Sequence, residues 1–381
     1  MMSKKVPELR FKGFTDDWEE RKLSDIADRF DNLRVPITAS DRKPGDTPYY
    51  GANGIQDYVE GFTHNGEFIL VAEDGANDLK NYPVQYVNGK VWVNNHAHVL
   101  QGKKTITDNK FLMNAIKNFN IEPFLVGGGR AKLNADVMMK LNILLPTFVE
   151  QEKIGSLFSL LDKTIALHQR KLDLLKEQKK GYLQKMFPKN GAKVPELRFA
   201  GFADDWEERK LSDVANHRGG TAIEKYFDKD GEYKVISIGS YGLNSQYVDQ
   251  NIRAISNEIT DGRVVNSGEL TMVLNDKTAN GTIIGRTLLV EKDNEYVINQ
   301  RTEIISPKEN FDSNFAYTIL NGSFREKVKR IVQGGTQIYV NYPAVSNLNL
   351  ELPKIEEQQK IGSFFKQLDN TIALHQRKLD L

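Results

Sequence analysis

Apolar and polar residues follow two different periods along this chain. An alternation of period two between Gly and Asn turns predicts strands, and it occurs in two groups. The first group is YVEGF, EFILVAED, VQYVNGK and KVWVNNHAHVL, and the second is YKVISIGSYG, ELTMVL, GTIIGRTLLVE and YVINQRTEIIS. A helical pattern closes each group, around NKFLMNAIKNF and NFAYTILNGSFREKVKRIV. The patterning therefore predicts two α+β bodies.

A longer helical pattern follows each body, directly after Leu-Pro at 145–146 and 352–353. Its apolar residues step by alternating fours and threes, as in a coiled-coil seam. Thr147 and Glu150 match a capping box, and a histidine at the same rung of each seam favours a register mark over a pH switch. We expect the helices to pair through Ile154, Phe158, Leu161, Ile165, His168 and Leu172 in the first and Ile361, Phe365, Leu368, Ile372, His375 and Leu379 in the second.

Two segments of the chain occur twice. Residues 150–174 recur as 357–381 with five differences in 25, and residues 6–25 recur as 194–213 with 18 identities in 20. The residues between these repeats show little similarity, so the chain consists of two cassettes with a repeated frame. The leading repeat contains Trp18 and Trp206, which we expect to pack against each body, and its WEERKLSD is expected to start a short helix.

The cassettes predict an α+β fold with two α/β domains separated by two long antiparallel coiled-coil helices, related by a pseudo-twofold axis. The expected boundaries are 1–146 for the first domain, 147–190 for the central helix, 191–353 for the second domain and 354–381 for the final helix. A second apolar stripe on the central helix widens its face beyond what one partner helix covers. It consists of Leu157, Leu160, Thr164, Leu167, Lys171 and Leu174.

Composition narrows the function classes. The 381 residues contain no cysteine, no run of 18 apolar residues and no signal-peptide pattern, so a cytoplasmic location without a membrane is expected. The formal net charge is +1, whereas a protein that holds DNA unaided through many phosphate contacts is usually more basic. Nucleic-acid binding would need local clusters or partners.

The search for catalytic motifs indicates no enzyme. The chain has neither a Gly-x-x-x-x-Gly-Lys-Ser/Thr phosphate loop nor a Pro-Asp dipeptide of a nuclease, although D/E-x-K triplets occur. His96 and His98 share one face of a predicted strand, but no third ligand is evident, so hydrogen bonding is favoured over a metal site. We expect no catalytic residue, metal or cofactor in this chain.

Glycine-rich loops near the end of each body carry the best nucleic-acid signal. Backbone amides in such a loop can approach a phosphate, while Arg suits guanine and Gln suits adenine. A loop that merely turns the chain, or ordinary surface charge, remains the alternative. The candidates are Asn77, Lys80, Gly128, Gly129, Arg130 and Lys132 in the first body, and Arg218, Lys225, Lys277, Gly334, Gly335, Thr336, Gln337 and Tyr339 in the second.

The whole arrangement resembles the DNA specificity (S) subunits of type I restriction–modification enzymes. The resemblance rests on two unlike bodies, each running through a Gly-Gly loop into LPTFVEQEKI or LPKIEEQQKI and a long helix. It implies two target recognition domains, each reading one half of a bipartite asymmetric site in double-stranded DNA. An alternative from another class is a coiled-coil scaffold with two β-rich binding domains.

The same resemblance implies the partners. Such a subunit is noncatalytic, and it binds two adenine methyltransferase (modification) subunits together with restriction and translocase subunits. S-adenosylmethionine, ATP and Mg²⁺ would then be bound by those partners and not by this chain. This would account for both the empty catalytic search and the modest charge.

Overall fold

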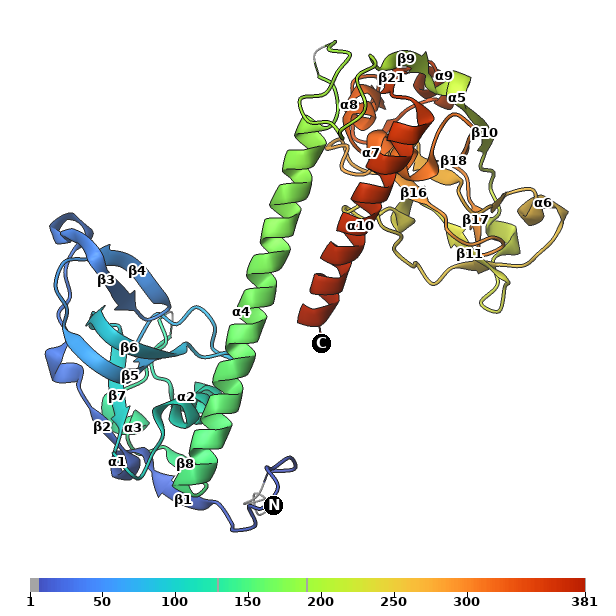
Figure 1. Cartoon of the computed structure of the whole chain (residues 1–381). Coiled ribbons are helices and arrows are strands. Elements are labelled where there is room, and N and C mark those ends of the chain that lie inside the picture. Colours follow the sequence, from blue (N-terminus) through green and yellow to red (C-terminus); the bar gives the residue numbers. More distant parts are fainter. Residues whose placement is uncertain (1–6, 129, 190, 381) are drawn as a thin grey trace. The chain divides into compact units, whose positions relative to one another are not determined.

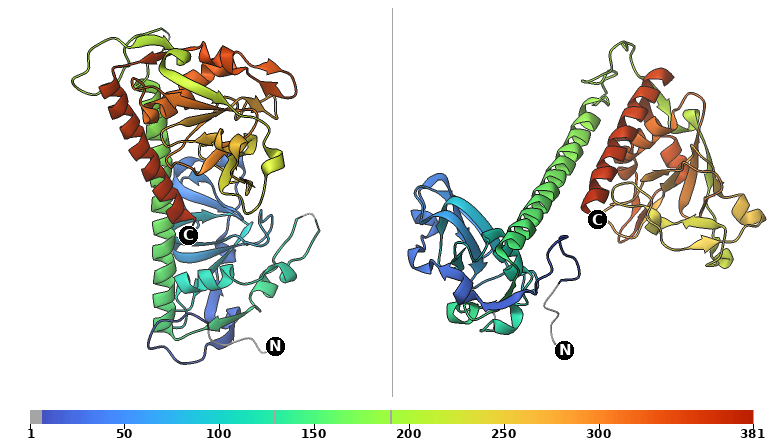
Figure 2. Two further views of the ribbon diagram at one scale, coloured as in Figure 1. Left: turned by 90° about the vertical axis from the view of Figure 1, so that its right-hand side faces the viewer. Right: turned by 60° about the horizontal axis from the view of Figure 1, so that its bottom comes forward.

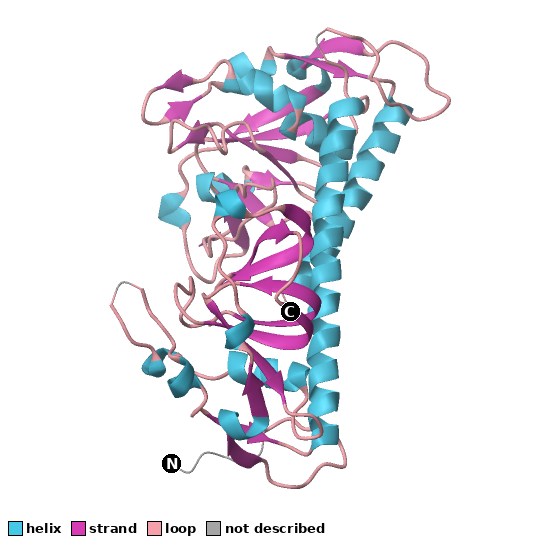
Figure 3. Ribbon diagram, turned by 90° about the vertical axis from the view of Figure 1, so that its left-hand side faces the viewer, coloured by secondary structure: helices cyan, strands magenta, loops and turns pink. Residues whose placement is uncertain are grey.

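A computed structural model describes residues 7–128, 130–189 and 191–380 of the chain. It divides into two compact units, Met1–Leu167 and His168–Leu381, which we describe separately as unit 1 and unit 2. The division falls inside one continuous helix, α4 (Phe148–Lys185), which Figures 1 and 3 show without interruption. Each unit therefore contains one α+β body and one part of α4.

Unit 1 is built on a six-stranded sheet in the order β2-β7-β5-β6-β3-β4. Its central strand, β5, reads FILVA from Phe68 to Ala72 and is buried on both faces, as expected of a strand between two layers. A separate pair, β1 with β8, joins the leading repeat to the end of the body. The strands are β1 (Glu19–Lys22), β2 (Ala27–Arg29), β3 (Pro44–Gly51), β4 (Gly54–Val59), β5 (His64–Ala72), β6 (Val84–Val93), β7 (Ala97–Gly102) and β8 (Asn142–Leu145).

Helix α2 packs on this sheet and on the start of α4. The Asp108 side chain accepts a hydrogen bond from the Phe111 amide and so caps α2, and the buried face of α2 joins the core of unit 1. Gly155 of α4 is required here, because a Cβ at that position would lie 2.5 Å from Asp108 Oδ1. The short helices are α1 (Leu23–Ile26), α2 (Asn109–Lys117), α3 (Ala135–Met138) and the 3-10 turns η1 (Asp31–Leu33), η2 (Ala39–Asp41) and η3 (Glu122–Phe124).

Unit 2 distributes its strands over four smaller sheets in place of one large one. These have the orders β10-β18-β14-β16, β12-β11-β17-β13, β15-β20-β19 and β21-β9. The strands are β9 (Glu207–Lys210), β10 (Ala215–Gly219), β11 (Tyr233–Ile236), β12 (Arg253–Ala254), β13 (Val264–Val265), β14 (Leu270–Val273), β15 (Asn275–Asp276), β16 (Thr287–Leu289), β17 (Tyr296–Ile298), β18 (Thr302–Pro307), β19 (Gln333–Gly334), β20 (Ile338–Tyr339) and β21 (Asn349–Leu352).

Helix α7 packs beside the final helix of unit 2, α10, which is the red helix in the two views of Figure 2. Gly322 separates α7 from α8, which breaks the single helical pattern of the sequence into two helices. The helices are α5 (Leu211–Val214), α6 (Glu258–Asp261), α7 (Ser313–Asn321), α8 (Ser323–Lys329), α9 (Tyr342–Ser346), α10 (Ile355–Leu379) and the 3-10 turns η4 (Glu224–Tyr226) and η5 (Ile238–Ser240).

The two repeated segments of each cassette bind each other through one ion pair. Arg10 donates two hydrogen bonds to Glu150, at 2.7 and 2.8 Å, and both glutamate oxygens are engaged. Arg198 and Glu357 repeat this pair at 2.7 Å for both bonds. Both glutamates are almost fully buried, so each leading repeat is fastened to the helix of its own cassette.

Two local expectations need correction. The capping box does not describe the start of α4, because the Glu150 carboxylate binds Arg10. The segment WEERKLSD does not begin as a helix: β1 and its counterpart β9 are strands, and the four-residue helices α1 and α5 follow them. Pairing with β8 and β21 overrides the local helical preference of Glu, Arg and Lys.

In unit 2, the last part of α4 and α10 run antiparallel. Lys179 Nζ lies 2.5 Å from Asp369 Oδ1, whereas the earlier residue His168 contacts the later residue His375. The two histidine Nδ1 atoms are 3.2 Å apart, so one ring donates and the other accepts. The antiparallel helix pair predicted by the seam is thus present in this unit.

Candidate nucleic-acid interface

The Gly-rich loop of unit 1 lies beside the loop that follows β5. Val126 and Lys132 exchange two backbone hydrogen bonds of 2.9 Å, which closes the Gly-rich segment into a hairpin. The Leu133 amide donates to the Glu73 carbonyl at 2.7 Å, so the hairpin is joined to the end of β5. We call the loop 73–80 and the hairpin 126–133 the first rim.

Arg130 is the most exposed cation with a defined orientation on the first rim. Its side chain is 60% exposed, and its Nη2 donates to Asp74 Oδ1 at 3.0 Å. The same carboxylate oxygen lies 2.6 Å from Nδ1 of His96. Arg130 is therefore oriented by a neighbour while part of its guanidinium remains open to solvent, as a base-reading arginine requires.

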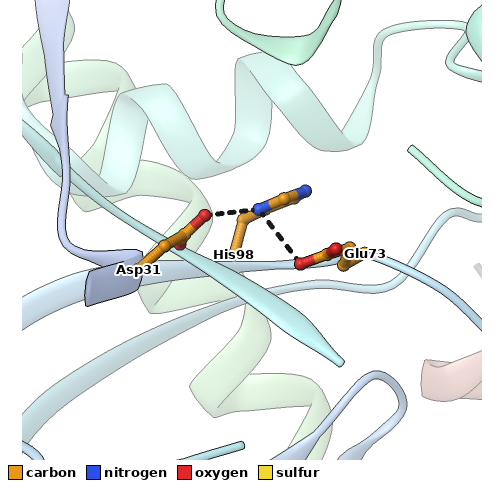
Figure 4. A group of neighbouring side chains, drawn as sticks. All are labelled: Asp31, Glu73 and His98. Atoms are coloured by element: carbon orange, nitrogen blue, oxygen red, sulfur yellow. Dashed lines mark hydrogen bonds and ion pairs between the residues drawn. The ribbon is translucent and has the colours of Figure 1, made fainter. Parts of the chain in front are cut away.

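At the base of the first rim, Glu73 forms a cluster with Asp31 and His98 (Figure 4). His98 Nδ1 is 2.7 Å from Asp31 Oδ2, and His98 Nε2 is 2.9 Å from the Leu133 carbonyl oxygen at the base of the hairpin. Burial alone would raise the pKa of Asp31, but the hydrogen bond with His98 lowers it below its usual value. The cluster thus ties the hairpin to β7 and η1.

The same cluster has the residue types of a metal site, since its ligand atoms lie within 4.8 Å of one another. However, Arg34 Nη1 lies 2.7 Å from one Glu73 oxygen and Lys132 Nζ lies 2.9 Å from the other. Burial raises the pKa of Glu73, but these two cations outweigh it and lower the pKa. A metal ion would have to displace both cations, so the residues fit an ion-pair network better than a cation site.

Unit 2 brings its Gly-rich loop beside a second loop in the same way. Strand β20 pairs with β15 on one side and with β19 on the other, so Tyr339 lies opposite both Asn275 and Gln333. Gly334 has a φ of +103°, and a Cβ there would collide with the Gln337 carbonyl, so the tight turn requires glycine. We call the loop 275–285 and the hairpin 333–339 the second rim.

Asp276 and Arg325 hold the second rim from beneath. Asp276 accepts backbone hydrogen bonds from Thr278 and Ile283 at 2.9 and 2.8 Å, which lower its pKa although its burial acts in the opposite direction. Arg325 donates three hydrogen bonds of 2.7–2.9 Å to the carbonyls of Gly281, Thr282 and Ile284. Burial lowers the pKa of this guanidinium to about 10.

The structure thus gathers most of the residues that the sequence suggested. Asn77, Lys80, Gly128, Arg130 and Lys132 lie on the first rim, whereas Gly129 lies outside the described residues. Lys277, Gly334, Gly335, Thr336, Gln337 and Tyr339 lie on the second rim, and its hairpin is exposed apart from Ile338. Their contact with DNA stays a prediction.

Two other candidates lie on different elements. Arg218 is on β10 and donates to both oxygens of Glu269 at 2.9 and 2.8 Å, so its charge is already neutralised. Lys225 is in η4, where its Nζ lies 4.7 Å from the centre of the Tyr226 ring. No local spacing in the sequence links the supporting side chains of the rims to the distant loops that they hold. The sequence patterns therefore did not point to Glu73, Asp74, Asp276 or Arg325.

The predicted seam residues have different surroundings along α4. In unit 2, His168 contacts His375, and Leu172, Ile361 and Phe365 are buried. In unit 1, Phe158, Leu161 and Ile165 are 43%, 45% and 55% exposed. Their place in a helix interface stays a prediction. No helix in the part of the chain that the structure describes is long and apolar enough to cross a bilayer.

The fold defines a class of two-bodied proteins, in which unlike α+β bodies are attached to copies of one helical frame. Residues 15–177 and 203–381 both match the type I restriction modification DNA specificity domain. The chain belongs to this family and carries two of its recognition domains. Specificity subunits of this family recognise DNA and are noncatalytic.

Individual relatives agree with this assignment. A protein of Haemophilus influenzae named as a type I restriction enzyme specificity subunit is 31% identical, over 93% of this chain and 89% of its own length. The type I restriction enzyme MjaVIII specificity subunit of Methanocaldococcus jannaschii is 24% identical, with 95% and 88% covered. The crystal structure of an S subunit from M. genitalium has the same fold, with a TM-score of 0.69, 13% identity and coverage of 100% and 95%.

Proposed function

We propose that each rim reads one half of a bipartite, asymmetric DNA target. The observation that carries this proposal is the same in both units: the residues suited to bases and phosphates meet on one exposed loop-and-hairpin rim, supported by polar and charged side chains beneath the loops. The supporting side chains differ, with Asp74 and His96 under Arg130 in unit 1 and Asp276 and Arg325 in unit 2. Different rims would read different half-sites.

The chain would direct chemistry that partner subunits perform. In this proposal, two methyltransferase subunits bind S-adenosylmethionine and modify adenine, while restriction and translocase subunits use ATP and Mg²⁺. Their complex with this chain would act on double-stranded DNA in the cytoplasm. The exposed leucines of α4 offer an apolar surface for such subunits: Leu160, Leu167 and Leu174 are 63%, 67% and 50% exposed.

The net charge supports a shared mode of DNA binding. At +1, the chain has few cations in excess of its carboxylates, and two cations of the first rim, Arg130 and Lys132, are already paired. Because nonspecific DNA affinity comes mainly from neutralising phosphates, the partners would supply much of it. The rims would then contribute discrimination between base pairs.

A body exchange tests the proposal. Residues 214–345 would be replaced by the corresponding body of a relative, and methylated adenines would be mapped in cells that contain the matching partner subunits. We expect one half of the target to change and the other half to stay. As the matched control, exchange of residues 26–145 should change only the other half. A change in both halves after either exchange would refute separate reading.

A further inference from the structure

The turn before β18 in unit 2 occupies the same place as the turn before β7 in unit 1. The His96 carbonyl accepts a hydrogen bond of 2.8 Å from the amide of Glu73, which directly follows β5. The Arg301 carbonyl accepts one of 3.0 Å from the amide of Leu274, which directly follows β14. Both carbonyls are therefore bound to the strand end that leads into the rim, and His96 and Arg301 are equivalent positions.

The asparagines that begin these two turns support the equivalence. The Asn94 amide donates to a carbonyl of β3 and the Asn299 amide to a carbonyl of β11, both at 3.0 Å. Their side chains are buried, and each accepts a hydrogen bond of 2.8 Å from an amide within the turn, His96 in unit 1 and Gln300 in unit 2. One turn is thus built in both units, although most of its side chains differ.

The Gly-rich hairpins also correspond. In each, the two closing residues pair antiparallel and lie the same number of positions apart: Val126 with Lys132, and Gln333 with Tyr339. Arg130 and Gln337 therefore stand at the same place in their hairpins. The second closing residue pairs with Asp74 in unit 1 and with Asn275 in unit 2. Each rim thus has three equivalent positions, one on the hairpin, one on the loop and one on the turn.

Each of these triplets contains one arginine, but at a different position. In unit 1 the arginine is on the hairpin: Arg130 Nη2 lies 3.0 Å from Asp74 Oδ1 and 3.2 Å from His96 Nδ1. In unit 2 the hairpin and the loop contribute the amides Gln337 and Asn275, and the arginine, Arg301, is on the turn. The second rim therefore has a cation beside Gln337 that its hairpin does not supply.

Arg301 combines a fixed backbone with a free side chain. Glu224 Oε1 accepts hydrogen bonds from the side chains of Asn299 and Gln300 at 3.0 and 2.8 Å, which holds the turn in place. Arg301 is exposed, and its guanidinium makes no hydrogen bond or ion pair with any other residue that the structure describes. A positioned residue with an unused hydrogen-bonding group is suited to recognise another molecule.

The backbone conformation of Arg301 points the same way. Its φ is +65°, in the left-handed region that residues with a large side chain rarely adopt and that glycine adopts freely. Within the described chain, no polar contact of the arginine side chain offsets this strain. The presence of arginine at this position is therefore better explained by binding than by folding.

We propose that Arg301 reads a base of the half-site bound by unit 2, beside the base that Gln337 reads. This inference rests on the proposed recognition of DNA by the rims. An arginine donates two hydrogen bonds to O6 and N7 of guanine, whereas a glutamine pairs with adenine. The half-site of unit 2 should therefore contain a G·C pair close to an A·T pair, and Arg301 should select the G·C pair.

Competition binding tests this role in the assembled complex of the chain with its partner subunits. The competitors are DNA fragments that each carry one base-pair substitution in the mapped target. We expect Arg301→Met to reduce discrimination about tenfold or more at one G·C pair of the half-site of unit 2, and to leave the other half-site unchanged. Arg301→Lys should lose as much, because an ammonium group cannot donate the paired hydrogen bonds of a guanidinium.

Two further variants control for folding and for surface charge. Arg301→Gly removes the side chain and relieves the left-handed backbone, so its thermal midpoint should equal or exceed that of the unmodified chain while discrimination is lost as in Arg301→Met. Arg209→Met is the matched control, because Arg209 is a 54% exposed arginine of β9 in the same unit. This variant should discriminate normally.

Three results would overturn the role of Arg301. Unchanged discrimination in Arg301→Met would do so, and an equal loss on all DNA sequences would indicate a phosphate contact instead of base reading. A lower thermal midpoint of Arg301→Gly would assign the arginine to the fold.

Exchange of residues 214–345, measured in the same assay, separates this inference from the proposed function. If the exchange changes one half-site but Arg301→Met changes none, only the role of Arg301 fails. If the exchange leaves both half-sites unchanged, the proposed function fails, and the role of Arg301 fails with it.

Discussion

Units 1 and 2 share a frame and differ in almost everything attached to it. Both fasten a leading arginine to a buried glutamate of the long helix, and both pack a capped helix against a glycine of that helix. Yet unit 1 has a six-stranded sheet, whereas unit 2 distributes its strands over four smaller ones. The two units thus share only a few contacts between body and frame, so the rest of each body can differ in sequence and in sheet arrangement.

The two rims also differ, in the contacts that support them. In unit 1, side-chain ion pairs orient Arg130 and support the hairpin. In unit 2, Asp276 and Arg325 bind mainly backbone groups of the loop. The side-chain pairs of unit 1 orient Arg130, whereas the backbone contacts of unit 2 hold the path of the loop itself. Each unit thus joins a loop to its Gly-rich hairpin, through side-chain ion pairs in unit 1 and through contacts to the backbone in unit 2.

The largest expected difference between the units concerns the equivalent residues Phe365 and Phe158. Phe365→Ala removes a ring that is 1% exposed, so we expect it to lower the free energy of unfolding by about 3–5 kcal/mol. Phe158→Ala, at 43% exposure, should cost about 1 kcal/mol or less. Urea denaturation of both variants measures this. Equal losses would mean that Phe158 is packed as tightly as Phe365 in solution.

The next largest expected effect is the loss of stability when Arg325, which supports the second rim, is replaced. Arg325→Met leaves the carbonyls of Gly281, Thr282 and Ile284 without these donors, which should lower stability by about 1–3 kcal/mol. Hydrogen exchange should become faster in the loop 275–285. Arg130→Met on the exposed first rim serves as the control and should leave stability almost unchanged. A stable Arg325→Met protein with a protected loop would contradict the assigned support.

If Arg130 reads a base, its replacement should reduce base discrimination in one half-site only. Arg130→Ala should reduce discrimination at one base pair of the half read by unit 1 by about 1–3 kcal/mol if the contact is bidentate. Competition binding of the assembled complex with single-base variants of the target measures this. Gln337→Ala should act on the other half alone. A uniform loss on all sequences would instead assign Arg130 to a phosphate.

The smallest expected effect concerns the histidine rung of unit 2. Partial burial and the nearby His168 lower the pKa of His375 below its ordinary value of 6.5. Near this pKa the folded chain binds fewer protons than the unfolded chain. The contribution of His375 to the free energy of unfolding is therefore fully present above about pH 6.5 and decreases as the pH falls below that value. Thermal unfolding should show a slightly lower midpoint at acidic pH, and His375→Gln should reduce the difference. An unchanged pH dependence in that variant would exclude His375 as its source.

The sequence alone determined the frame, because repeats and hydrophobic periods are local properties. The two cassettes, most strands, the long helices and the Gly-rich loops all follow from patterns within short windows. The strands β1 and β9 were missed, since pairing with distant segments overrode local preference. The break between α7 and α8 at Gly322 was missed as well. Candidate rim residues were found one loop at a time, without their mutual arrangement.

Only the tertiary structure decided which of those loops meet and what supports them. Asp74 lies beside Arg130 and Asp276 lies opposite Ile338 because sheet pairing brings together residues more than 50 positions apart. The same holds for the leading repeats: each contains a tryptophan at the same position, but only packing distinguishes the buried Trp206 from the half-buried Trp18. Burial is a property of what surrounds a residue, and a repeated sequence does not carry it.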